Sequence, residues 1–159
     1  AFVSTPSAEE ARQVFAVRRM LETEMTRAFV RSSTPAKLKV LRTHVASEAA
    51  ALSAQDASGR TELLGDFHVR MAELMGNDVL AQLLRDLISR CALITLMYQS
   101  ASEAAHSHEE HAEIVAALAA RDEALAVQLM HQHLEHVEAS LIFDREQPVN
   151  ELSLALSPL

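Results

Sequence analysis

Residues 109–134 read EEHAEIVAALAARDEALAVQLMHQHL. Apolar residues follow His111 at three, four and seven positions, which places them on one face of a helix together with that histidine. His133 lies three and four residues from apolar neighbours in the same way. Asp122 between the two patterns has the position of a helix N-cap. The stretch therefore predicts two helices joined by about three residues, which pack antiparallel.

The same reasoning extends to the rest of the chain. Only three glycines and four prolines interrupt 159 residues, there is no tryptophan, and 49% of the residues are hydrophobic, which favours long helices over sheets. Ser107 and Glu110 have the spacing of a capping box, so we expect a helix to begin there and His106 and His108 to lie in the preceding loop. The predicted helices cover about residues 8–31, 35–54, 60–75, 78–99, the stretch from the cap Ser107 to about 119, and the stretch from the cap Asp122 to about 143.

The expected fold class is all-α, an antiparallel bundle of six to seven helices. We expect three segments along the chain. Residues 1–7 are β-leaning and end near a proline, so they are interpreted as a linker from something upstream. Residues 8–143 form the bundle, and residues 144–159 form a C-terminal tail.

Charge and composition exclude several function classes. The net charge of −8 argues against a segment that binds nucleic acid by itself, because phosphate contacts need clustered Lys and Arg. No apolar run approaches the ~20 residues that span a bilayer, and no signal peptide is visible. The single cysteine, Cys91, lies in an apolar run and is interpreted as a reduced, buried thiol of a cytoplasmic protein.

Three histidines are the candidate metal ligands. His68 has apolar residues at −4, +3 and +7, so it faces the core, as His111 and His133 do. Three imidazoles that converge from three helices would form an open metal site with room for water or a ligand. Helix faces alone leave the alternative of three unrelated, half-buried histidines open.

A family resemblance rests on an ordered series of short motifs, in which His133 follows His111 by 22 positions. Over about residues 8–142 the chain resembles the FCD domain, the C-terminal effector-binding domain of FadR-type GntR-family bacterial transcription regulators. The motifs are Arg18-Arg-Met-Leu-Glu22, Phe67-His68, Gly76-Asn77, Glu110-His111, Ala117-Leu118, Asp122 and His133-Leu134.

The resemblance implies a homodimer that binds a small carboxylate effector in the bundle core. It also implies that DNA is bound only through a winged helix in an N-terminal domain that this sequence lacks. Family members hold a divalent metal through an aspartate and three histidines, which correspond here to His68, His111 and His133. The implied metal is zinc or nickel.

One position departs from the family pattern. Leu64 stands where the aspartate is expected, and Asp66 lies about 200° around the helix from His68. Either water or effector oxygens complete a three-histidine shell, or the imidazoles bind the ligand without a metal.

The resemblance also suggests effector-binding residues. Arg18 corresponds to the family arginine that meets the ligand carboxylate, and Asn77 belongs to the Gly-Asn motif. Arg90 and Tyr98 are further pocket candidates, with a surface arginine and a core-edge tyrosine as equally good interpretations.

The expected function is therefore ligand sensing in a transcription regulator, not catalysis. The alternative is a helical metalloenzyme with an open three-histidine site. Against it, no general base is expected beside the cluster, because Glu110 and Glu135 directly precede a histidine and cannot share its face. A third candidate is a pure dimerisation module without a ligand.

Overall fold

The structure, a computed structural model, describes residues 7–141. Within that range it is an all-α bundle of six helices, as predicted. The helices are α1 (Ala8–Ser32), α2 (Pro35–Ser53), α3 (Ala57–Leu74), α4 (Asp78–Tyr98), α5 (Ala101–Ala119) and α6 (Glu123–Ser140). Residues 1–6 of the predicted linker 1–7, and the whole predicted tail 144–159, lie outside the described residues.

Each helix begins at a side chain that accepts a hydrogen bond from a free backbone N–H of the first turn. These N-cap residues are Ser7, Thr34, Asp56, Asn77, Ser100 and Asp122. Such caps satisfy donors that have no partner inside the helix. Gly76 ends the third helical segment with a φ of 75°, a left-handed conformation that glycine adopts without a steric cost. Local sequence thus sets most of the boundaries.

The predicted start of the fifth helix is wrong. Ser100 and Glu103 form a reciprocal capping box seven residues earlier, with the same spacing as the pair that starts at Ser107. Ser107 is buried in the middle of α5. As a consequence, His106 and His108 are helical residues and not loop residues. The third helix also begins earlier than predicted, because the Asp56 carboxylate accepts the Gly59 N–H at 2.9 Å.

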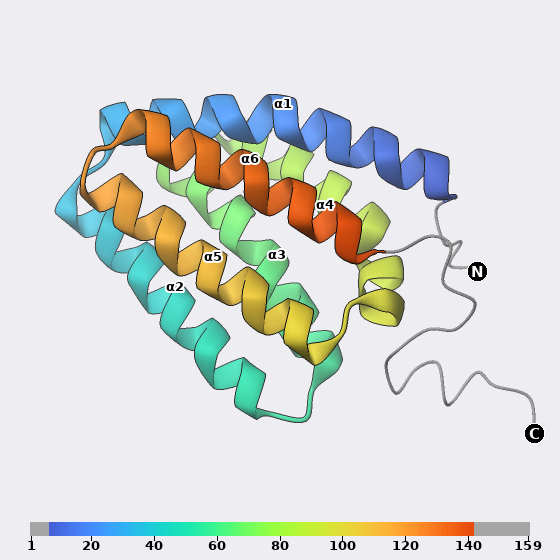
Figure 1. The fold of residues 1–159 in the computed structure, drawn as a ribbon. Coiled ribbons are helices and arrows are strands. Elements are labelled where there is room, and N and C mark those ends of the chain that lie inside the picture. The colour runs from blue at the N-terminus through green and yellow to red at the C-terminus, as the bar shows by residue number, and fades with distance from the viewer. Residues whose placement is uncertain (1–6, 142–159) are drawn as a thin grey trace, which may run out of the picture.

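The helices pack in a defined order around one main core. α1 lies along α6 and also contacts α4, α2 packs on α3 and α5, α3 packs on α4, and α5 packs on α6 (Figure 1). The three residues that join α5 and α6 make these two helices antiparallel neighbours, as predicted. Phe29, Phe67, Met130 and other fully buried side chains fill the centre. Among residues 7–141, none of the helices combines the length and apolar character that a membrane span requires.

Candidate metal centre and effector cavity

His68, His111 and His133 meet inside the bundle. They come from α3, α5 and α6, and none exposes more than 3% of its surface. Nε2 of His133 lies 3.0 Å from Nε2 of His111 and 3.3 Å from Nε2 of His68. Phe67 stacks on the His111 ring, with 4.0 Å between the ring centroids. We call these three histidines the inner cluster.

A glutamate holds the other nitrogen of each ring. Nδ1 of His68 contacts a carboxylate oxygen of Glu22 from α1. Nδ1 of His111 lies 2.7 Å from Glu48 of α2, and Nδ1 of His133 lies 3.2 Å from Glu110 of α5. A carboxylate only accepts hydrogen bonds, so each Nδ1 carries the proton and each Nε2 presents a lone pair.

This arrangement fits a metal ion. Three lone pairs aimed at each other at about 3 Å repel unless a cation or a proton lies between them. A histidine that binds a metal through one nitrogen and donates its other N–H to a carboxylate is the usual arrangement in metal sites. The donor set of the inner cluster therefore suits a divalent ion that prefers imidazole, such as zinc or nickel.

The protonation states point the same way. Burial lowers the pKa of His68 and of His133 to about 4, even though the neighbouring glutamates favour the charged rings. Burial also lowers the pKa of His111. The glutamates behave oppositely: burial alone would raise the pKa of Glu22, but the charges and hydrogen bonds of Arg18 and His68 lower it to about 2. At neutral pH the rings are thus neutral donors beside ionised carboxylates.

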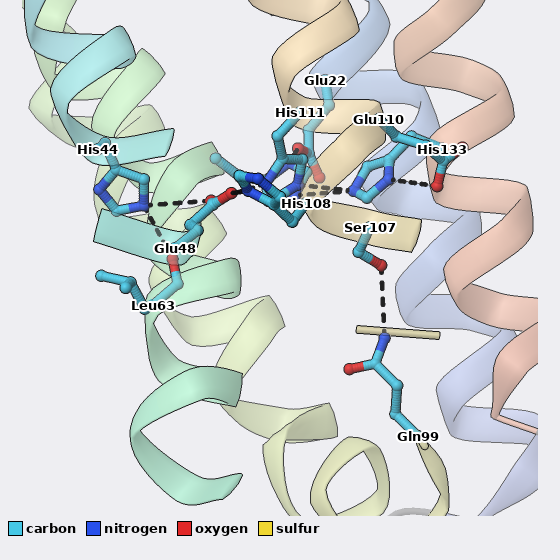
Figure 2. Close-up of polar contacts among 11 residues, drawn as sticks. Glu22, His44, Glu48, Leu63, Gln99, Ser107, His108, Glu110, His111 and His133 are labelled. Atoms are coloured by element: carbon cyan, nitrogen blue, oxygen red, sulfur yellow. Dashed lines mark hydrogen bonds and ion pairs between the residues drawn. The ribbon is translucent and has the colours of Figure 1, made fainter. Parts of the chain in front are cut away.

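Glu48 connects several histidines. Its side chain is fully buried and also contacts Nδ1 of His108 at 3.2 Å and Nε2 of His44 at 3.5 Å. His44 in turn lies 2.9 Å from the carbonyl oxygen of Leu63. In Figure 2 Glu48 lies between His44 on one side and His108 and His111 on the other. These contacts fix the carboxylate that orients His111.

A cavity of about 780 Å³ lies beside the inner cluster, with all three histidines in its wall. This volume is within the usual range for small-ligand pockets. Arg18 and Phe15 of α1 line it, and the Arg18 Nε donates to Glu22 at 2.7 Å. At another part of the wall Gln99 lies 3.5 Å from Ser107 (Figure 2). The cavity wall therefore combines apolar side chains, the buried guanidinium of Arg18 and neutral polar groups. It also includes the charged residues Glu62, Asp66, Arg70, Glu73 and Arg85.

The other suggested effector-binding residues lie elsewhere. Asn77 caps α4 through its side chain, and Arg90 is exposed and pairs with Glu10 at 3.3 Å. Tyr98 packs against the smaller core cluster near Cys91. None of the three is among the residues that line the cavity. Their part in ligand binding remains a prediction, and Arg18 is the one of the four that reaches the cavity.

Leu64 occupies the position where the family pattern has an aspartate. Leu64 is 8% exposed and lies in the cavity wall one turn before His68. Burial raises the pKa of Asp66, whose charge interacts with Glu62 and His44. The three histidines form a potential metal-binding group without either residue.

Sequence reasoning missed the three glutamates. It expected no general base beside the cluster and did not consider carboxylates that contact Nδ1 of the rings. Glu110 does not share a face with His111, as expected, but it reaches His133 on the neighbouring helix. Glu22 and Glu48 lie 46 and 63 residues from the histidines they hold. A buried carboxylate is unfavourable unless it has a partner, so a glutamate on the core side of a helix implies one. That position was the available signal.

Comparisons with known proteins agree with this architecture. The FCD domain family matches residues 13–136. A solved structure of a Streptococcus agalactiae GntR protein superposes with a TM-score of 0.71 at 23% identity, covering 83% of this chain and 59% of that protein. No curated protein matches the chain. The chain spans less than two thirds of the GntR protein, so the likeness concerns the fold of one part of it. Because the family match covers most of the chain and the bundle has the expected fold, this chain belongs to the FCD domain family.

Proposed function

We propose that this domain senses a small organic acid, which binds in the cavity beside a metal ion held by the inner cluster. The observation that carries the proposal is the convergence of three Nε2 atoms, each oriented by a glutamate, at the wall of a ligand-sized cavity. His68, His111 and His133 would hold the ion, and zinc or nickel suits their nitrogen donors. When bound, the ion supplies a Lewis acid that attracts carboxylate oxygens.

Arg18 would bind the ligand carboxylate through hydrogen bonds, in addition to the metal ion. Its Nε is engaged by Glu22, whereas the guanidinium carries further N–H donors on its two terminal nitrogens. An arginine fork binds a carboxylate with directional, charge-assisted hydrogen bonds. Arg18 is buried, so such bonds would form away from competing water.

In the whole protein, the ligand would act on DNA binding by a fused winged helix. A ligand changes an equilibrium only to the extent that it binds one arrangement better than another. The cavity wall includes residues of α1, α3, α4, α5 and α6, so a bound ligand would lie among five of the helices. The proposal includes a homodimer in the cytoplasm, since two copies of a domain can couple ligand binding to the spacing of two DNA-binding units.

The metalloenzyme alternative is less well supported. The glutamates beside the inner cluster contact the Nδ1 side of the rings, and none of the three is among the residues of the cavity wall. They orient ligands and do not reach a substrate. The family match also points to a regulator.

A thermal-shift screen tests the proposal. The purified chain is treated with EDTA, reloaded with zinc or nickel, and screened against small mono-, di- and hydroxycarboxylates. We expect at least one acid to raise Tm in the metal-loaded protein, because a ligand that binds only the folded state stabilises it.

His133→Gln should remove this shift, and His131→Gln serves as the control. His131 lies on the same helix but is half exposed and pairs with Glu135. If no acid stabilises the loaded protein, or if the shift is the same in both variants, the proposed site is wrong.

A further inference from the structure

A second group of potential ligands lies at the surface next to the inner cluster. His106 and Glu110 are on α5, His136 is on α6, and each offers a ligand atom within 4.8 Å of the others. The Glu110 carboxylate lies 2.6 Å from Nδ1 of His136 and 3.8 Å from Nε2 of His106. We call these three residues the outer cluster.

The backbone holds the outer cluster in place. His106 and Glu110 are four residues apart on one helix, so they share a face. α6 packs against α5 after a connection of three residues, which brings His136 beside them. The two imidazole rings lie 5.6 Å apart between centroids. Two elements of the rigid bundle, and no loop, therefore supply the three side chains.

Glu110 differs from an ordinary surface carboxylate. It is only 12% exposed, and its other contact is the N–H of the buried His133 at 3.2 Å. The contacts to His133 and His136 therefore orient the carboxylate before any ion arrives, whereas both histidines of the outer cluster are more than half exposed and accessible.

We propose that His106, Glu110 and His136 form a second, outer site for a divalent transition-metal ion of the zinc class. Two imidazoles and one carboxylate are a common ligand set for zinc, with water in the remaining position. Magnesium and calcium prefer all-oxygen sites, so they are poor candidates. Zinc–ligand bonds of about 2.0–2.2 Å place tetrahedral ligands about 3.3–3.6 Å apart. The outer ligand atoms already lie within 4.8 Å of one another, so their separations need to change by no more than about 1.5 Å.

The outer site shares Glu110 with the inner cluster, which couples the two. An ion on the outer site draws charge from the carboxylate that orients His133. The Nε2 of His133 then becomes a weaker donor, because the partner of the other ring nitrogen sets its basicity. Loading the outer site therefore weakens metal binding at the inner cluster, and by linkage the reverse holds. The outer site itself does not depend on the proposed function, whereas this coupling rests on it.

Equilibrium dialysis against buffered zinc tests the outer site. The EDTA-stripped chain is compared with His106→Gln and His136→Gln, and bound zinc per chain is measured by elemental analysis. We expect each variant to hold one zinc equivalent fewer than the unaltered chain, or to bind it more than about tenfold more weakly, the lower limit for loss of a supporting group. The control is His131→Gln, because His131 is another exposed histidine of α6 with a glutamate partner. This variant should bind as many zinc equivalents as the unaltered chain.

The difference in bound zinc between the unaltered chain and each variant decides the outcome, whatever the inner cluster binds. If the inner cluster holds zinc, the expected change is from two equivalents to one, and if it holds none, from one to zero. Two independent single variants at exposed positions guard against misfolding, which the Tm in EDTA reports. Equal zinc content in the unaltered chain, His106→Gln and His136→Gln would overturn the outer site, and so would an equal loss in His131→Gln.

Discussion

Nδ1 of His111 lies 2.7 Å from a carboxylate oxygen of Glu48, and both side chains are completely buried. The contact joins α2 to α5 and leaves Nε2 of His111 directed at the other two histidines. Burial would raise the pKa of Glu48, but hydrogen bonds from His111 and His44 lower it to about 2. A structural carboxylate thus sets which nitrogen of His111 can bind a ligand.

Replacing Glu48 with Gln should weaken metal binding at the inner cluster. The neutral amide accepts a weaker hydrogen bond than a carboxylate, so His111 becomes a poorer donor. We expect metal affinity to fall by about 10- to 100-fold, the usual effect of losing such a partner. Competition with a chelator of known affinity measures it.

Glu113→Gln is the matched control, because Glu113 lies on α5 close to His111 but is exposed. Its metal affinity should equal that of the unaltered chain. An unchanged affinity in Glu48→Gln would show that the carboxylate does not tune the site.

Replacing Leu64 with Asp should strengthen metal binding. The new carboxylate would lie one turn before His68 on the same helix face, in the wall that contains the inner cluster. A fourth protein ligand should raise metal affinity by at least about tenfold, equivalent to ~1.4 kcal/mol. In EDTA the same variant should be less stable than the unaltered chain, by about 2–5 kcal/mol, because a buried leucine is lost.

The control for this variant is Leu64→Asn, which has nearly the same shape but no charge. It should share the loss of stability in EDTA without the gain in affinity. Equal metal affinity of Leu64→Asp and Leu64→Asn would contradict the predicted role of this position.

Helical periodicity explains why the inner histidines could be predicted and their partners could not. It identifies residues on one face of one helix, so His68, His111 and His133 could each be assigned to the core side. It does not say which faces of two helices meet. The link between His68 and Glu22 spans 46 residues and depends on how α1 and α3 pack.

The prediction of where α5 begins was wrong for a different physical reason. Two Ser-x-x-Glu patterns occur seven residues apart, and both satisfy the local rule for a capping box. Ser100 forms the cap, whereas Ser107 is buried within the helix beside Gln99. That error hid the outer cluster, since His106 faces Glu110 only when both are helical.

Acid should destabilise the metal-free protein in two stages. The pKa values of His68 and His133 are about 4 in the folded chain against 6.5 for free histidine. The unfolded chain therefore binds more protons between these values, and stability falls as the pH drops from about 6.5 to about 4. The pKa of Glu22, Glu48 and Glu110 is about 2 against 4.5, so their contribution is lost below pH 4.5.

Urea unfolding in EDTA across this pH range measures the effect, which should be on the order of a few kcal/mol. His44 acts in the opposite direction: burial alone would lower its pKa, but contacts with Glu48 and the Leu63 carbonyl raise it. Its contribution is full at low pH and is lost as the pH rises through its folded pKa. His133→Gln should flatten the upper stage and His131→Gln should not; a pH-independent stability above pH 4 would contradict the prediction.

Replacing Arg18 with Lys should separate ligand recognition from folding. Removing the charge altogether would leave the buried Glu22 carboxylate without a charged partner, which costs up to about 3–5 kcal/mol and would mix a folding defect with any loss of ligand binding. Lysine keeps a positive charge near Glu22 but lacks the planar fork that binds a carboxylate through two donors. We expect a small change of Tm in EDTA together with a more than tenfold weaker response to the stabilising acid.

Arg19→Lys is the matched control on the next residue. Arg19 is only partly buried and pairs with Glu138 on α6 at 2.5 Å, away from the cavity wall. It should bind the acid as the unaltered chain does. If Arg18→Lys and Arg19→Lys respond alike to the acid, the guanidinium of Arg18 does not contact the ligand, and recognition has to come from the inner cluster alone.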